Sequence, residues 1–413
     1  MKKTTYQIFD SPAGKTIVFS NLYLINGKFI FNGPAPNDDL STFPNIHYRF
    51  TNFQKWAPQI TKLPENQEAQ IITTPHFYLK ETLHYHPVHT IFDDVFSVFY
   101  SLYRCKIDYN QMICVLDIFN NETEEYYDCK GIFKLLFGNE AITLHYLKRS
   151  HQQVCFETFV VGNSGSGVSS YDFNYVSPFQ DNIWRQFRDA IYKKAEITLG
   201  PADKVIYLSR HYDKYDLEER LKDTLKKHNI EVYNYGGKDI KEQLDVLKNV
   251  KIYITTSGSN ALNSVFLPDN AVVINLGRVY ASNDYKIITY GEDYLYPSLS
   301  YIDVLYFEDY YSLTINEHDT IPEPNDLIEM VNAVIGEKNP LLMKRNNIYK
   351  NFASVVIDKI PAVLKLNNFS PNARLLFENY SVKERIEMIE RFKGGNLSFA
   401  CSEKICHLKN KYK

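Results

Sequence analysis

One stretch of the chain, residues 251–276, constrains the fold more than any other. It predicts an apolar strand over 251–256, a turn of small residues at Ser257–Asn260, a helix over 261–267 that ends at Pro268, and a strand over 271–276. The same alternation occurs upstream, with strands predicted over 204–209 and 231–235 and helices over 216–228 and 238–249. Strands and helices that alternate at this spacing are typical of a parallel α/β sheet covered by helices.

The ends of two of these strands carry candidate ligand-binding groups. The turn Ser257-Gly258-Ser259-Asn260 opens a helix, where free N–H groups and the helix dipole favour an anion. Arg210 directly follows the strand that ends at Ser209, and a guanidinium binds phosphate through two parallel hydrogen bonds. Ligands of parallel sheets bind beyond the carboxyl ends of the strands, where both segments fall. The alternatives are a surface ion pair between Arg210 and acidic residues at 216–219, and a small polar turn without a ligand.

A second candidate site lies on a helix predicted over 87–103, in which Pro87 suits the first position. His89 and Asp93 are four residues apart and so share a face, while Asp94 flanks the apolar stripe on its other side. A carboxylate beside a histidine near a helix N-terminus can act as a general base towards a hydroxyl group. One alternative is a histidine that caps the backbone beside a solvated pair of aspartates. Another is a metal site of His84, His86, His89 and Asp93, whose spacing does not match known zinc sites.

The length of 413 residues suits two domains of medium size rather than one core. We expect an N-terminal domain over 1–195, with strands that include 154–161, and a second domain over 201–335 that holds the parallel sheet. Residues 162–170 are rich in glycine and serine and are predicted to form a loop. The tail, 336–413, is expected to be mostly helical and to pack back across the domains.

Composition argues against several classes of protein. The net charge of −3 and the pI of about 6.4 argue against a nucleic-acid-binding protein, which concentrates basic residues. No run of about 18 apolar residues predicts a membrane span, and the N-terminus lacks the apolar core of a signal peptide. The six cysteines show no metal-binding spacing, so we expect free thiols. Together these features predict a soluble, cytoplasmic protein.

Taken in order, these motifs resemble glycosyltransferase family 61, and most closely its protein O-mannose β-1,4-N-acetylglucosaminyltransferase branch. The run His89-Thr-Ile-Phe-Asp-Asp-Val-Phe-Ser-Val-Phe-Tyr-Ser-Leu102 resembles His-x-x-x-Asp-Asp-Leu-Leu-Pro-Leu-Phe-Tyr-Thr-Leu of that branch. Cys155–Gly162 resembles Cys-Phe-x-x-x-Val-Val-Gly, and Leu208–Arg210 resembles Ile-Ser-Arg. Ser257–Pro268 aligns without a gap with His-Gly-Ala-Gly-Leu-Thr-Asn-x-x-Phe-Leu-Pro.

The resemblance implies a GT-B architecture, in which two Rossmann-like domains face a cleft, with helices at the C-terminus. It also implies an inverting reaction without a metal, which agrees with the lack of an Asp-x-Asp triplet in this sequence. By the same resemblance Asp93 is the base, with His89 and Asp94 beside it, and the donor contacts Arg210, Ser257, Gly258, Ser259, Asn260 and Asn263. Family members of the secretory pathway carry a membrane anchor. Its absence here implies a bacterial or large-virus enzyme, which in the viral case acts in the host cytoplasm.

The function predicted from the sequence is transfer of a sugar from a nucleotide donor, expected to be UDP-linked, to a hydroxyl of a glycan, glycolipid or glycoprotein. No metal or other cofactor is expected. Ser257 stands where the family has histidine, which removes a group near the phosphates, and Ser97 stands where the family has proline. The change at Ser257 keeps open a non-catalytic protein that binds sugars or nucleotides or acts as a scaffold. A nucleotide-sugar epimerase of the same fold is a further alternative.

Overall fold

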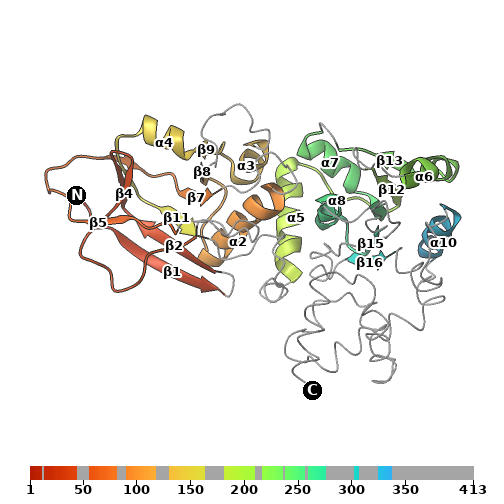
Figure 1. Ribbon diagram of the computed structural model, residues 1–413, viewed down its shortest axis with the longest axis horizontal. Helices are drawn as coiled ribbons and strands as arrows, with labels where there is room; N and C mark the ends of the chain where they lie inside the picture. Colours follow the sequence, from red (N-terminus) through yellow and green to blue (C-terminus); the bar gives the residue numbers. More distant parts are fainter. Residues whose placement is uncertain are drawn as a thin grey trace, which may run out of the picture. The chain divides into compact units, whose positions relative to one another are not determined.

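The computed structural model describes residues 1–11, 14–43, 55–80, 90–117, 130–162, 181–209, 216–235, 238–255, 259–275, 302–306 and 324–336. The chain divides into two units (Figure 1). Unit 1 comprises Met1–Tyr171 and Asp189–Ala195, and unit 2 comprises Asp172–Arg188 and Glu196–Lys413. Both units combine sheets with helices, which confirms the α/β class. The predicted domain boundaries stay a prediction, and the tail 337–413 lies outside the described residues.

The larger sheet of unit 1 is mixed rather than all parallel. Its strands lie in the order β1 (Thr5–Ser11), β2 (Gly14–Ser20), β11 (Phe159–Gly162), β7 (His76–Lys80), β8 (Ile113–Asp117) and β9 (Ile142–Thr143). β11, β7, β8 and β9 run parallel, whereas β1 and β2 form an antiparallel hairpin that extends the sheet beyond β11. The central strands are continuous apolar runs, as expected for strands covered on both faces.

A second, five-stranded sheet of unit 1 takes its strands from the same parts of the chain. The order is β5 (Gln59–Thr61), β4 (Lys28–Asn32), β3 (Leu22–Ile25), β10 (Gln153–Phe156) and β6 (Gln70–Ile72). The chain passes from one sheet to the other at Asn21, at 73–75 and at 157–158. Backbone hydrogen bonds tie the last two corners, from Glu157 N to Ile72 O (2.9 Å) and from His76 N to Thr158 O (3.1 Å).

These corners correct one prediction. The apolar run 154–161, predicted as one strand, is two strands that belong to different sheets. Hydrophobic residues on both sides of the corner, among them Val154, Phe156, Phe159 and Val161, enter the same core. The polar pair Glu157-Thr158 lies at this corner, but two polar residues between apolar ones do not by themselves end a predicted strand.

The two sheets of unit 1 share an aromatic core, over which helices pack. The rings of Phe29, Trp56, Tyr78 and Phe159 contact one another with centroids 4.9 to 6.1 Å apart. The described helices of this unit are the π-helix η1 (Thr90–Val95), α2 (Phe96–Cys105), α3 (Lys130–Phe137) and α4 (Leu144–Ser150), together with the end of α5 (Asp181–Ala195).

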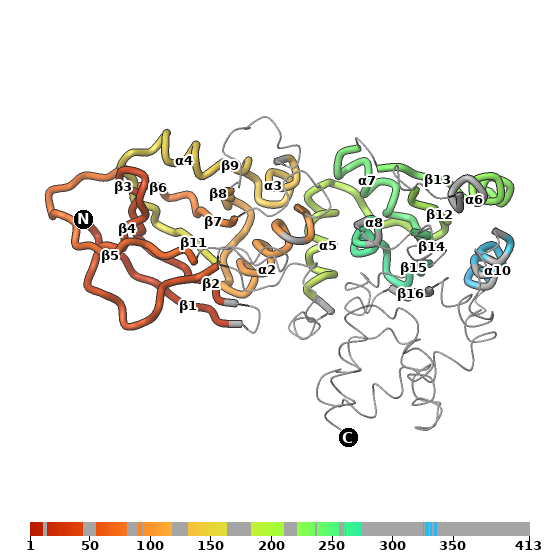
Figure 2. Tube along the Cα trace, in the orientation of Figure 1, coloured from red at the N-terminus to blue at the C-terminus, as the bar shows by residue number. Residues whose placement is uncertain are grey.

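Unit 2 contains the parallel sheet that the sequence predicts. Its strands follow the order β13 (Glu231–Tyr233), β12 (Lys204–Leu208), β14 (Val250–Thr255), β15 (Ala271–Asn275) and β16 (Ile302–Tyr306). The first four of these strands can be traced in Figure 2. The helices are α6 (Asp216–Lys227), α7 (Ile240–Leu247), α8 (Ser259–Leu262) with the 3₁₀ helix η3 (Asn263–Phe266), and α10 (Pro324–Ile335). The strands and helices predicted over 204–256 lie within two residues of the observed bounds.

Successive side chains of β14 point to opposite faces of the sheet and therefore pack in different surroundings. Ile252 and Ile254 are buried in one core with side chains of α6 and α10. Tyr253, between them, projects to the opposite face, where its hydroxyl donates a hydrogen bond to Asn260 O (2.8 Å). The segment that follows β14 is therefore anchored back onto the strand from which it leaves.

Candidate functional site

The order of strands in unit 2 reverses between β12 and β14. From β12 the chain passes through α6 to β13 on one side, and from β14 it passes through α8 and η3 to β15 on the other. β12 and β14 are direct neighbours, with Tyr207 paired with Ile254. In open parallel sheets, ligands characteristically bind outside the carboxyl ends of two strands whose connections diverge in this way.

Both candidate donor-binding segments follow these two strands. β12 ends at Leu208, and Ser209 N donates to Tyr233 O (2.8 Å). β14 ends at Thr255, which is fully buried. Arg210, Ser257 and Gly258 come directly after these ends and lie outside the described residues. The structure therefore brings together the strand ends that precede the two predicted segments, which are almost fifty residues apart in the sequence.

The helix predicted over 261–267 differs from the one observed. It begins at Ser259, for which only the backbone is described, and has one α-helical turn before continuing as the 3₁₀ helix η3. A helix dipole is the sum of aligned peptide dipoles, so one turn provides little of it. An anion at this turn would depend on individual hydrogen-bond donors and on a cation rather than on a long helix.

Asn263 occupies an unusual environment at the start of η3. It is 1% exposed, and neither Nδ2 nor Oδ1 is in hydrogen-bonding geometry with any described residue. The amide lies beside the hydroxyl of Tyr253, where it opposes the rise in the tyrosine's pKa that burial causes. Ser264 Oγ, the next side chain, is also buried without a hydrogen bond in the described part of the chain. Buried polar groups of this kind cost free energy unless a partner satisfies them, and they occur at binding sites.

In unit 1, the predicted base lies on a helix that begins with π-helical turns. η1 spans Thr90–Val95, and α2 continues to Cys105, so the predicted helix is present over its described part. π-helical hydrogen bonds join residues i and i+5, and such segments are frequent at functional sites. The four-residue spacing that placed His89 and Asp93 on one face assumes an α-helix, whereas Asp93 itself lies in the π-helix. His89 lies outside the described residues, and only the backbone of Asp93 is described.

Asp94 is buried rather than solvated, with 0% of its surface exposed. Burial raises the pKa of the neighbouring Cys114 thiol on β8, and the negative charge of Asp94 raises this pKa further. The alternative of a solvated pair of aspartates is therefore wrong for Asp94. A hydroxyl from solution does not reach this carboxylate in the observed conformation, and the choice of Asp93 as the base stays a prediction.

The region that contains β12, β14 and the turn after β14 matches a known protein family. Residues 144–274 match the family model of glycosyltransferase 61. The match covers about a third of the 413 residues and supports a glycosyltransferase. None of the curated proteins compared with the chain matches it.

The glycosyltransferase 61 match begins at Leu144, the first residue of α4, and ends within β15. It therefore includes β12, β14, the reversal of strand order between them, and all the candidate donor-binding residues. The candidate base segment at 89–94 lies outside the match. The donor assignments and the base assignment are thus supported by different observations.

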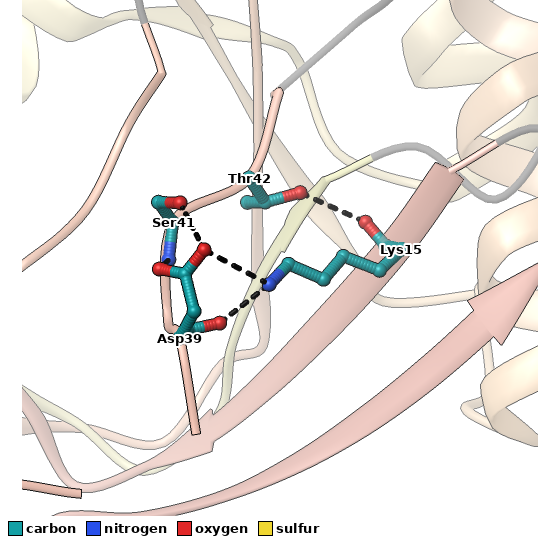
Figure 3. A network of polar contacts seen from close by, with 4 residues as sticks. All are labelled: Lys15, Asp39, Ser41 and Thr42. Atoms are coloured by element: carbon teal, nitrogen blue, oxygen red, sulfur yellow. Dashed lines mark hydrogen bonds and ion pairs between the residues drawn. The ribbon is translucent and has the colours of Figure 1, made fainter. Parts of the chain in front are cut away.

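The glycosyltransferase 61 match also includes Gly162, the last residue of β11, which lies close to Lys15 O and Thr42 Oγ1. Lys15 and Thr42 belong to a polar network with Asp39 and Ser41, which Figure 3 shows. Lys15 Nζ donates to Asp39 O and lies 4.0 Å from Asp39 Oδ2. Two hydrogen bonds from Ser41, at 2.9 and 2.7 Å, lower the pKa of the Asp39 carboxyl group. Thr42 Oγ1 donates to Lys15 O (2.9 Å). A Cβ atom at Gly162 would collide with both of these atoms, and its φ of +107° disfavours every other residue.

The described residues offer no metal site. Among them, no group of three or more His, Cys, Asp or Glu side chains could hold a metal ion. His84, His86 and His89, which formed the alternative metal site, lie outside the described residues. In the same described part of the chain, no helix is both long and apolar enough to cross a membrane.

Arg188 on α5 was not predicted from the sequence, although it contacts the segment that joins η3 to β15. Its Nη1 atom donates to Leu267 O (2.8 Å) and to Asp269 Oδ1 (2.7 Å). The partners are about eighty residues away in the sequence, so no local pattern indicates the contact. The sequence shows only an arginine on an amphipathic helix. Whether that arginine is buried is decided by the tertiary structure.

Proposed function

We propose that this protein transfers a sugar from a nucleotide-sugar donor, expected to be UDP-linked, to a hydroxyl group of a glycan or glycoconjugate. The reaction inverts the anomeric carbon and needs no metal ion, and the two units form a GT-B enzyme. The observation that carries the proposal is the reversal of strand order between β12 and β14, inside the segment similar to glycosyltransferase 61.

The donor diphosphate would bind outside the carboxyl ends of these two strands. Arg210 follows β12 and would place a guanidinium against the phosphates as the leaving group gains negative charge. Ser257, Gly258 and Ser259 follow β14 and would contribute backbone N–H groups from the turn. Asn263, whose buried amide lacks a hydrogen bond among the described residues, would gain a partner when the donor binds or the turn closes over it.

The first experiment is thermal unfolding of the wild type and of Arg210→Ala with UDP, GDP, CDP and ADP, each with and without EDTA. A ligand at about one hundred times its dissociation constant stabilises a protein by roughly 2.7 kcal/mol. We expect UDP to raise the Tm of the wild type with or without EDTA, and Arg210→Ala to lose this shift. A shift that EDTA abolishes would contradict the metal-independent mechanism, and a shift retained by the variant would remove Arg210 from the site.

The second experiment tests the base. Asp93→Asn keeps the size and hydrogen-bonding capacity of the side chain but cannot accept the proton of the acceptor hydroxyl. We expect turnover to fall by at least about a hundredfold, while the UDP-dependent Tm shift stays at the wild-type value. Normal turnover in this variant would place the base elsewhere.

The competing function is a non-catalytic protein of the same family, and Ser257 in place of the family histidine favours it. Such a protein would bind a nucleotide or a sugar but would neither transfer nor hydrolyse UDP-sugars. An epimerase would instead convert the donor sugar without any acceptor. Product analysis of a UDP-sugar panel, with and without sugar acceptors, separates these three functions.

A further inference from the structure

Two arginines on α5 bind the segment that follows η3 through hydrogen bonds and ion pairs. Arg188, with 3% of its surface exposed, donates from Nη1 to Leu267 O and to Asp269 Oδ1 at 2.8 and 2.7 Å. Arg185, one turn earlier on the same helix, places Nη2 3.2 Å from the other carboxylate oxygen of Asp269. The ring of Phe187 packs against Phe266, the last residue of η3, with centroids 6.4 Å apart.

The two arginines do not make equivalent contacts. The Arg185 side chain is 43% exposed and that of Asp269 is 45% exposed, so their ion pair is screened by water and contributes little. The Arg188 side chain is 4% exposed, and one of the two acceptors named above is a backbone carbonyl. A charged donor in such a place holds the backbone at a defined position, because leaving it unbonded would cost its full desolvation energy.

The segment that Arg188 contacts, Leu267 to Asp269, is directly continuous with the helix η3 that begins at Asn263. Leu267 is the C-cap of η3, its N–H donates to Ser264 O (3.1 Å), and η3 itself begins at Asn263. Asn263 and Ser264 carry buried polar atoms without hydrogen bonds among the described residues. If η3 could move freely, these polar groups would lower their free energy by turning towards water. Their burial therefore requires that the surrounding structure restrain η3.

We propose that Arg188 is a positioning residue for the donor site: it holds Leu267, and through η3 it keeps Asn263 oriented for the nucleotide-sugar. This inference rests on the proposed function, because it assumes that the segment after β14 binds the donor. Arg188 itself acts on backbone and carboxylate atoms of its own unit and makes no contact with the donor.

The test compares three variants with the wild type by calorimetric titration with UDP, GDP, CDP and ADP. Arg188→Met removes the hydrogen bonds to Leu267 and Asp269 and keeps the apolar stem, whereas Arg188→Lys keeps the charge but not the planar guanidinium. Leu221→Ala is the matched control, since Leu221 is a buried α6 residue in the core of the same unit and is not one of the Arg188 partners named above. Hydrogen exchange at the amides of 263–271 measures how firmly η3 is held in each variant.

We expect Arg188→Met to weaken binding of the nucleotide at least about tenfold and to speed exchange across 263–271. Arg188→Lys should fall between Arg188→Met and the wild type, and Leu221→Ala should lower overall stability without changing nucleotide affinity. Wild-type affinity in a folded Arg188→Met or Arg188→Lys protein would overturn the positioning role, as would equal losses in Arg188→Met and Leu221→Ala. If no nucleotide binds the wild type, the proposed function fails, and the donor role of Arg188 fails with it.

Discussion

His76 is a buried histidine whose protonation should destabilise unit 1. It begins β7, is 3% exposed, and its ring lies 4.9 Å from that of Phe156 between centroids. In the neutral form Nδ1–H donates to Thr74 O (2.8 Å). Burial lowers the pKa of His76 from 6.5 to about 4, the hydrogen bond to Thr74 partly offsets this effect, and the nearby His151 adds to it.

The sign and size of the effect follow from this pKa. The folded state takes up a proton near pH 4 and the unfolded state near pH 6.5, so between these values the unfolded state binds more protons. Stability is therefore full above pH 6.5 and falls as the pH is lowered towards 4. One pKa unit corresponds to about 1.4 kcal/mol, so the loss reaches roughly 2 kcal/mol at pH 5 and roughly 3 kcal/mol at pH 4.

The perturbation is His76→Asn, which keeps a donor for Thr74 O but does not titrate. The chain has two tryptophans, Trp56 in unit 1 and Trp184 in unit 2. With Trp184→Phe in every protein, the fluorescence of Trp56 reports urea unfolding of unit 1 selectively. The free energy of unfolding is measured at pH 7 and pH 5 for each protein.

We expect the His76→Asn protein to lose about 2 kcal/mol less than its parent between pH 7 and pH 5, whatever its stability at pH 7. Other groups titrate in both proteins and cancel in the comparison. His228→Asn is the control, because His228 is exposed and lies in unit 2. Equal losses in the His76→Asn protein and its parent would refute the reasoning, since His76 would then not be buried as a neutral ring.

Two further predictions use matched pairs of substitutions and urea unfolding. Gly162→Ala should destabilise unit 1 by about 2 kcal/mol or more, because of its positive φ and the collision described above. Gly131→Ala on α3, where a Cβ meets nothing within 4 Å, should be stabilising by roughly 0.5–1 kcal/mol, and the opposite order would contradict the structure. Asp239→Ala removes the capping box of α7 and should cost about 1 kcal/mol, whereas Asp245→Ala removes an exposed ion pair and should cost less than about 0.5 kcal/mol. Equal effects of the two aspartate substitutions would show that the cap is not formed in solution.

The local pattern of apolar and polar residues was sufficient to predict most strands and helices of unit 2. Apolar runs of four to six residues alternate with helices whose buried positions recur at helical spacing, and both signals depend only on neighbours in the sequence. The same signals were less reliable in unit 1, where the run 154–161 continues through a corner between two sheets. β16 was also not predicted, and residues 276–301 before it lie outside the described residues.

The candidate site depended on both levels. The types of residue that could bind a diphosphate, Arg210 and the turn at 257–260, were read from the sequence, as was their place after strands. That they follow neighbouring strands on the two sides of a reversal became clear only from the order β13-β12-β14-β15-β16. The burial of Asp94 and Asn263 and the grip of Arg188 on Leu267 were likewise invisible in the sequence.

The sequence by itself determined the alternation of strands and helices and the chemical groups at the strand ends, because period and propensity act over a few residues. The tertiary structure decided which strands are neighbours, which polar groups lose contact with water, and which distant side chains restrain them. These outcomes depend on pairings between segments tens of residues apart, such as that of β12 with β14. The free energy of such pairings comes from burial and hydrogen bonds that exist only once the chain has folded.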